Sequence, residues 1–165
     1  MKILDILEEP KGTTYSTLLR AMAERCNLFS LVIRNSRDAD KAKSILTSLL
    51  PCARNTIQSD RWPGTMLIRS KATVHFYELN DQSIQILEQT KRLYGWISPQ
   101  YPEDLAFYTP AGKCCLGSTA HEEDSYIIAS VFSADDIRKK VPTLKTTVRE
   151  IEDKERIYEP TMCRR

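Results

Sequence analysis

Hydrophobic residues recur along the 165-residue chain at two spacings, one that fits a helix face and one that fits a strand. Three segments have the helical spacing, and each begins after a residue that can cap a helix. Their apolar faces carry Leu19, Ile45 and Leu87. The predicted helices run from Thr13 or Thr14 to about Cys26, from Asp38 to Pro51, and from Asn80 or Asp81 to Gly95.

Runs rich in β-branched and aromatic residues predict the strands. Residues 28–34 read as a buried strand, and residues 65–79 fit two strands or one bent strand around Val74. Residues 51–64 are polar and irregular, and residues 145–156 fit either a strand or a helix. Three more strands joined by tight turns should pair as an antiparallel meander, continued by the strand around Val74. They are Leu105 to Tyr108, Lys113 to Ala120 and Tyr126 to Phe132.

The helices and strands do not alternate regularly, which favours an α+β fold over a βαβ fold. We expect an antiparallel or mixed sheet with a C-terminal three-stranded meander and about three helices packed on one face. Ser133 and Asp136 have the spacing of a capping box for a further short helix through Lys140. Residues 1–159 are predicted to form a single domain, and residues 160–165 a loose tail.

The composition is ordinary for a globular protein, with 41% hydrophobic residues and a formal net charge of +2. This near balance of charge predicts no nucleic-acid partner. The N-terminal apolar run is interrupted by Asp5, Glu8 and Glu9, and no run reaches the length of a membrane span. We therefore expect a cytoplasmic protein that has no membrane partner, and the oligomeric state stays open.

The five cysteines show no C-x-x-C spacing, which predicts reduced and mostly buried thiols. The two histidines are isolated from each other and from the cysteines in the sequence, so they offer no compact set of metal ligands. Neither a glycine-rich phosphate loop nor a nucleophile elbow is present. The sequence therefore predicts neither a metal nor a cofactor.

One stretch, residues 96–124, gathers polar and aromatic side chains on predicted turns and strand ends, where functional groups usually lie. Aromatic residues dominate the energetics of protein interfaces, and an acidic rim would favour a basic partner. A non-enzymatic protein-binding domain is the leading hypothesis, of the immunity or regulatory type, with a toxin or defence component as the candidate partner. The predicted partner-binding residues are Trp96, Tyr101, Glu103, Asp104, His121, Glu122 and Glu123.

The alternative hypothesis is a small hydrolase or transferase that uses His121 as a general base. Glu122 or Asp104 would orient the imidazole, and Ser118 or Cys115 would be the nucleophile. These groups would have to lie within hydrogen-bond reach of one another, which the sequence alone does not establish.

The blocks W-P-G-T, P-E-D-L-A-F-Y and A-H-E occur in this order between about Cys26 and Ile128. In these blocks the chain resembles a family of small, uncharacterised bacterial proteins, some labelled stage III sporulation proteins of the AH type. A membrane-anchored sporulation component should carry a membrane-spanning segment, and the sequence contains no such run. The resemblance therefore supports the domain boundaries and implies no catalytic residues. The small size and near-neutral charge are similar to those of bacterial immunity proteins.

Overall fold

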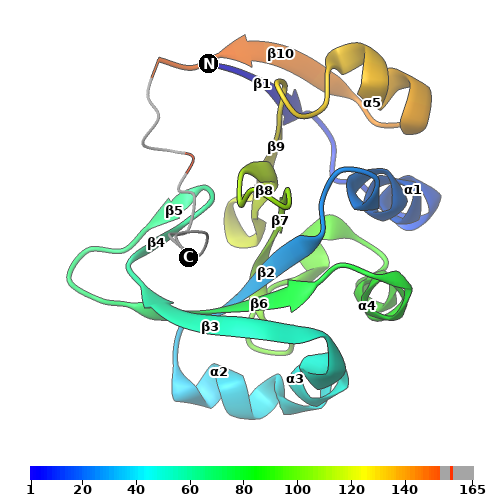
Figure 1. The fold of residues 1–165 in the computed structure, drawn as a ribbon. Helices are drawn as coiled ribbons and strands as arrows, with labels where there is room; N and C mark the ends of the chain where they lie inside the picture. The colour runs from blue at the N-terminus through cyan, green and yellow to red at the C-terminus, as the bar shows by residue number, and fades with distance from the viewer. Residues whose placement is uncertain (153–156, 158–165) are drawn as a thin grey trace.

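Eight strands form one antiparallel sheet in the order β10-β1-β9-β8-β7-β2-β6-β3 (Figure 1). The structure is a computed structural model that describes residues 1–152 and 157. The tail predicted for residues 160–165 lies outside these residues, as does the end of the predicted domain. The strands of the sheet are β1 (Lys2–Ile6), β2 (Leu28–Ile33), β3 (Ala53–Ser59), β6 (Ala72–Glu78), β7 (Glu103–Tyr108), β8 (Cys114–Thr119), β9 (Asp124–Ile128) and β10 (Thr146–Glu150).

Five α-helices lie within the described residues, and the predicted α+β class is confirmed. They are α1 (Gly12–Ala23), α2 (Ser36–Lys41), α3 (Lys43–Leu49), α4 (Asp81–Leu87) and α5 (Ala134–Lys140). Short 3₁₀ turns extend this set at η1 (Leu50–Cys52), η2 (Glu88–Thr90), η3 (Leu93–Gly95) and η4 (Ala120–Glu122).

The capping residues explain where several helices begin. Asn80 and Ser83 form a reciprocal capping box at the start of α4, and Ser133 and Asp136 form the predicted one at α5. The predicted cap of α1 is wrong, because that helix begins at Gly12, after Lys11, without a side-chain cap.

Two predicted helices are shorter than expected. The helix predicted after Asp38 is two helices, separated at Ala42, and the first is capped by Asn35 rather than by Asp38. The helix predicted to reach Gly95 ends at Leu87, and Lys91 then adopts a left-handed conformation that a helix cannot continue through.

The predicted meander is present as β7, β8 and β9, but two of its details are wrong. The strand after β7 in the sheet is β2, so β6 with Val74 does not continue the meander directly. The third strand ends at Ile128 instead of Phe132, because the backbone turns there and the Phe132 N–H donates to the Ile128 carbonyl.

Two strands of the eight-stranded sheet were absent from the predictions, and both lie at or next to a border of the sheet. Residues 53–59 of the segment read as irregular form β3, whose side chains are mostly exposed and so show no alternation. The N-terminal β1 pairs with β9 and β10, which are distant in sequence. Residues 146–150, read as strand or helix, are the strand β10.

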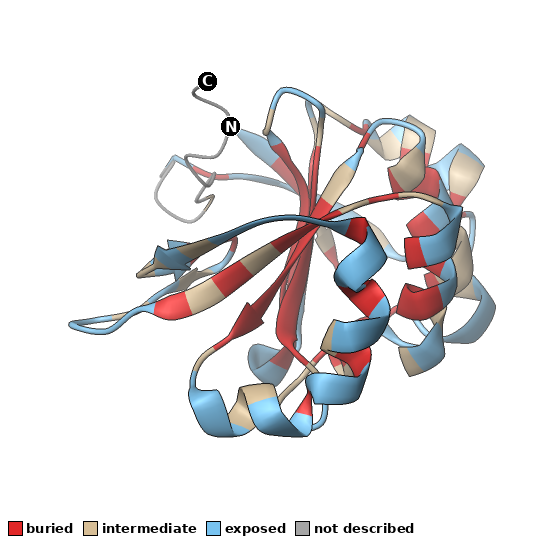
Figure 2. Cartoon of the chain, turned by 60° about the horizontal axis from the view of Figure 1, so that its bottom comes forward, coloured by how far each residue is buried: buried red, intermediate tan, exposed pale blue. Residues whose placement is uncertain are grey.

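The main core lies between the sheet and the helices, and contains Leu19, Ile45 and Leu87 from α1, α3 and α4. These three predicted helices therefore share one core, as expected, and α5 adds Ile137 to it. Figure 2 shows buried residues along the central strands and exposed residues on the outer faces of the helices. A smaller cluster on the opposite face includes Trp62, which belongs to a separate two-stranded hairpin, β4 (Arg61–Trp62) and β5 (Thr65–Met66).

None of the helices in the described part of the chain combines the length and apolar character needed to cross a membrane.

Candidate functional site

Several charged and aromatic side chains meet at one end of the sheet. The end of β2 lies beside the start of β7, where Val32 is paired with Glu103, and η4 follows the end of β8. The hairpin β4-β5 covers the same end, because a side chain at Gly64 would collide with Thr119. We call Arg34, Trp62, Glu103, Asp104 and His121 the polar cluster.

Asp104 is the residue of the polar cluster whose carboxylate connects three elements of the fold. Its side chain is fully buried, and its two oxygens accept hydrogen bonds from different elements. Trp62 Nε1 donates to Oδ2 at 2.8 Å, and the backbone N–H of Ala120 donates to Oδ1 at 2.9 Å. Burial raises the pKa of Asp104, although both hydrogen bonds oppose this change. The carboxylate therefore ties the hairpin and η4 to β7.

Arg34 supplies the positive charge next to the two carboxylates. Its Nε donates to Glu103 Oε2 at 2.7 Å, and a terminal nitrogen lies 3.7 Å from Asp104 Oδ2. The guanidinium also lies 5.4 Å from the centre of the Trp62 ring, within the range of a cation–π contact. A buried carboxylate is costly unless it is paired, so Arg34 explains how Glu103 and Asp104 lie side by side in the fold.

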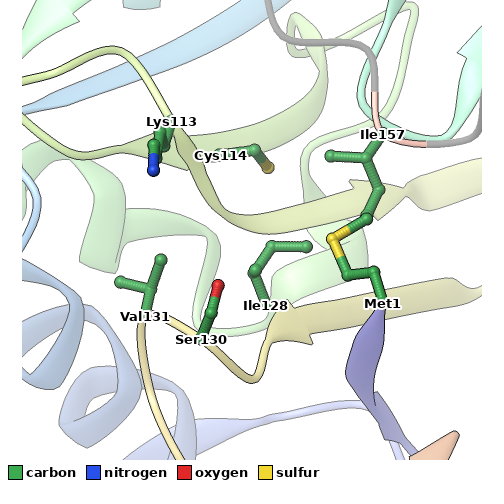
Figure 3. A pocket seen from close by; sticks show the side chains of 7 residues that line it. All are labelled: Met1, Lys113, Cys114, Ile128, Ser130, Val131 and Ile157. Atoms are coloured by element: carbon green, nitrogen blue, oxygen red, sulfur yellow. The ribbon is translucent and has the colours of Figure 1, made fainter. Parts of the chain in front are cut away.

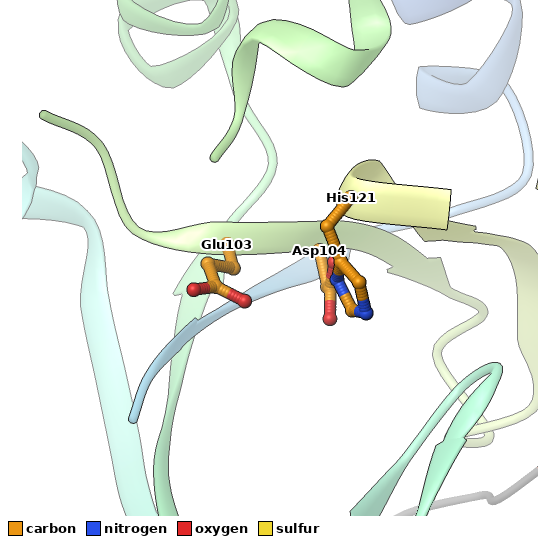
Figure 4. A group of neighbouring side chains, drawn as sticks. All are labelled: Glu103, Asp104 and His121. Atoms are coloured by element: carbon orange, nitrogen blue, oxygen red, sulfur yellow. The ribbon is translucent and has the colours of Figure 1, made fainter. Parts of the chain in front are cut away.

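Glu103, Asp104 and His121 each offer one possible metal-ligand atom, and these three atoms lie within 4.8 Å of one another. Figure 4 shows the three side chains pointing the same way from β7 and η4. These are the residues that could hold a cation. However, the guanidinium of Arg34 already lies against both carboxylates and would repel a divalent ion. The geometry favours an internally paired cluster over a metal centre.

The structure separates the predicted partner-binding residues into two groups. Tyr101 is half-buried, and His121, Glu122 and Glu123 are exposed on the turn at η4. The His121 side chain is 43% exposed, and its Nε2 lies 3.7 Å from Glu122 Oε1. These residues are accessible to a partner, and their role in binding stays a prediction.

The expectation of a surface position is wrong for Trp96, Glu103 and Asp104, which are buried. The Trp96 ring packs in the main core, where its Nε1 donates to the Tyr15 hydroxyl at 2.8 Å. Glu103 and Asp104 are held inside by Arg34 and by the hairpin, partners that lie far away in the sequence. The predicted acidic rim is therefore reduced to the turn at η4.

The alternative hypothesis of an enzyme needs a nucleophile near His121. Ser118 is buried and donates through Oγ to the Leu105 carbonyl at 2.8 Å. Cys115 is also buried, and its Sγ lies 3.8 Å from the Lys113 carbonyl oxygen. Both proposed nucleophiles are thus buried, whereas the His121 side chain is exposed.

The main residues that sequence reasoning missed are Arg34 and Ile68. Arg34 follows β2 directly, and its salt bridge to Glu103 spans 69 positions, which no local pattern encodes. Ile68 is 82% exposed in the segment after β5. The apolar run Met66 to Ile68 directly after the W-P-G-T turn could have indicated an exposed loop residue, but the run was predicted to be part of a strand.

Two cavities open on the face of the sheet opposite the helices. One, with a volume of about 270 Å³, is lined by apolar side chains such as Met1 and Ile128, with Lys113 at its border (Figure 3). The other, about 310 Å³, lies between Gly64 and Arg149 and includes Glu122 of the exposed turn. Among the described residues, neither cavity is lined by any member of the polar cluster.

Comparison with protein families, with curated proteins and with solved structures gives no match to this chain.

Proposed function

We propose that the chain is a non-enzymatic protein-binding domain of the immunity or regulatory type, which neutralises or regulates a partner protein. The interface would lie at the end of the sheet that carries the polar cluster. It would combine the exposed turn His121 to Glu123 with the segment 67–71, which we call the tip loop. The observation that carries this proposal is the exposure of Ile68 on a loop whose base is firmly anchored.

The anchor of the tip loop is the hairpin β4-β5. Trp62 is buried in the cluster opposite the helices and hydrogen-bonds Asp104. Pro63 lies against Gly117, where an added Cβ would approach its ring to 2.9 Å. Leu67 packs against the same cluster, and its N–H donates to the Asp60 carbonyl. Because the base of the tip loop is already fixed, binding through Ile68 requires less loss of conformational entropy in the loop.

An exposed isoleucine forgoes about 1.5 to 3 kcal/mol of burial free energy, which a partner with an apolar recess would recover. The tip loop protrudes from the body of the domain in both views (Figures 1 and 2). Single exposed apolar residues are common on protein surfaces. The position of Ile68 on a protruding loop with a fixed base distinguishes it from a scattered surface residue.

The charges around Ile68 favour a protein partner whose surface carries both acidic and basic groups. Arg69 and Lys71 are exposed within the tip loop, whereas Glu122 and Glu123 are exposed on the turn at η4. Gly64 and Glu122 line the same cavity, so the hairpin and the acidic turn are neighbours. A surface with both signs of charge next to an apolar anchor selects its partner by electrostatic complementarity.

The test is site-specific photo-crosslinking in the native host. A photoreactive side chain replaces Ile68 in one variant and Val148 in the control, since Val148 is also exposed but lies on β10 at the far border of the sheet. We expect one protein to be crosslinked from position 68 and not from position 148. Ile68→Asp should abolish recovery of that protein and leave the free energy of unfolding within about 0.5 kcal/mol of the original.

The purified partner then decides whether the domain neutralises or regulates it. We expect its activity to change when the original protein is added in equal amount, and to stay unchanged with Ile68→Asp. If position 68 yields no protein, or the same proteins as position 148, the proposed interface is wrong.

A further inference from the structure

The strand β3 forms one border of the eight-stranded sheet. Within the described residues it pairs with β6 on one side only, and five of its seven side chains are exposed. Figure 2 shows it exposed along most of its length. An edge strand presents backbone N–H and C=O groups that can pair with another strand. The Thr56 N–H is covered by the Asn55 side chain, whose Oδ1 accepts it at 2.8 Å.

The sequence of this edge is complementary to itself when it runs antiparallel about Ile57. Arg54 then faces Asp60, Asn55 faces Ser59, and Thr56 faces Gln58, with Arg54 at the β-bulge opposite β6 and Asp60 directly after the last residue of the strand. The central position pairs Ile57 with its own copy. Opposite charges and matched polar residues directly across two strands stabilise an antiparallel pair, and like charges destabilise it.

We propose that two copies of the chain associate through β3, with a two-fold axis at Ile57, and form one continuous sheet. In a dimer with a two-fold axis, if residue i of one copy contacts residue j of the other, residue j of the first copy also contacts residue i of the second. An antiparallel pairing of residues 54–60 centred on Ile57 has this symmetry. The dimer would contain two Arg54–Asp60 pairs and one contact between the two Ile57 side chains.

The side chains needed for this pairing are accessible. The Arg54 and Asp60 side chains are 55% and 44% exposed, and each is now paired with a neighbour in its own chain, Glu78 and Arg61 respectively. Exposed ion pairs contribute little to stability, so exchanging them for contacts across the edge costs little. Ile57 is half-buried against the cluster opposite the helices and keeps part of its surface available.

The other border of the sheet lacks this property. When β10 is turned antiparallel about Val148, Thr147 faces Arg149 and Lys145 faces Ile151, which gives no pair of opposite charges. Arg149 also forms a salt bridge to Asp5 of the adjacent strand, with 2.7 Å between its terminal nitrogen and Oδ1. Charges on an edge normally prevent association. On β3 they would exclude foreign strands while matching a second copy.

Sedimentation velocity on the full chain over a range of concentrations tests the proposal. We expect a monomer–dimer equilibrium for the original protein. Arg54→Asp and Asp60→Arg each turn both charge pairs repulsive, and each should weaken the dimer on the order of tenfold or more. The double variant with both changes should dimerise like the original. Val148→Lys is the matched control at the other border and should leave the dimer unchanged.

The decisive sample is an equimolar mixture of the Arg54→Asp and Asp60→Arg variants. In a mixed dimer each position 54 faces a position 60 of opposite charge, so two variants that dimerise poorly alone should dimerise together. Circular dichroism of each variant checks that it is folded. A monomeric original protein at every concentration, or a mixture that stays as weak as its components, would overturn the proposal. A dimer lost with Val148→Lys would do the same.

Discussion

Trp62 Nε1 donates a 2.8 Å hydrogen bond to Asp104 Oδ2, joining two buried side chains that lie 42 positions apart. The bond connects the hairpin β4-β5 to the start of the strand β7. The backbone of Asp104 is in the left-handed region there, with a positive φ of 58°. The base of the tip loop therefore depends on a carboxylate in the polar cluster, so that the buried cluster and the exposed loop form one structural unit.

Removing the Asp104 carboxylate should destabilise the fold strongly. Asp104→Ala leaves the indole N–H of Trp62 and the backbone N–H of Ala120 buried without an acceptor, and leaves Arg34 with one carboxylate instead of two. We expect a loss of about 3 to 5 kcal/mol in the free energy of unfolding, measured by urea denaturation. A loss below about 1 kcal/mol would contradict the central role assigned to Asp104.

Asp104 should also make stability depend on pH in a defined direction. Burial raises its pKa in the folded state above the ordinary value of 3.8, so the folded protein holds this proton more tightly than the unfolded chain. The contribution of Asp104 to stability therefore falls as pH rises from the unfolded pKa through the folded pKa. We expect the difference in unfolding free energy, wild type minus Asp104→Asn, to decrease with pH across this window. A difference that rises instead would reverse the assigned shift.

Ile127 should be far less tolerant of change than Glu123. Ile127 is fully buried in β9, where it is paired with Leu4 on one side and Leu116 on the other. Ile127→Asp should unfold the domain, and Ile127→Ala should cost about 2 to 5 kcal/mol. Glu123→Ala changes an exposed side chain and should stay within about 0.5 kcal/mol. Thermal melting followed by circular dichroism separates these outcomes, and a tolerant Ile127 would show that the placement of β9 is wrong.

The buried thiols should react slowly in the native protein. Cys26 has its pKa raised by a hydrogen bond with the Cys115 thiol and by burial, which disfavours the reactive thiolate. Cys163 lies outside the described residues, so Cys163→Ser is the background for the measurement. We expect alkylation by iodoacetamide to be slow without denaturant and to become rapid and complete in urea. Rapid modification of Cys26 in the folded protein, located by mass spectrometry, would contradict its buried position.

Sequence reasoning predicted the parts of the fold that local patterns encode. The strands around Val74, Leu116 and Ile127 show alternation or apolar runs, Asn80 is a residue type that caps helices, and the capping box at Ser133 has a fixed spacing. The parts it missed depend on distant partners. β3 is exposed and has no alternation, and the order in which β2 enters the sheet is set by packing across the whole domain.

The same division applies to the candidate site. Residues 121–123 lie on an exposed turn, as the sequence predicted. Glu103 and Asp104 follow a proline at a strand start, a pattern typical of a solvated turn, but Arg34 and Trp62 enclose them. No pattern within a short window contains information about a residue 42 or 69 positions away.

The position of β1 between β9 and β10 sets a condition on how the chain can fold during synthesis. Asp5 forms a salt bridge with Arg149, 144 positions later, so the ribosome makes β1 long before its strand partners. Leu4 and Ile6 must stay without their strand partners while most of the domain is translated. The half of the sheet built from β2, β3 and β6 can assemble first, because its strands are close in sequence. Closure of the other half waits until β10 has left the ribosome.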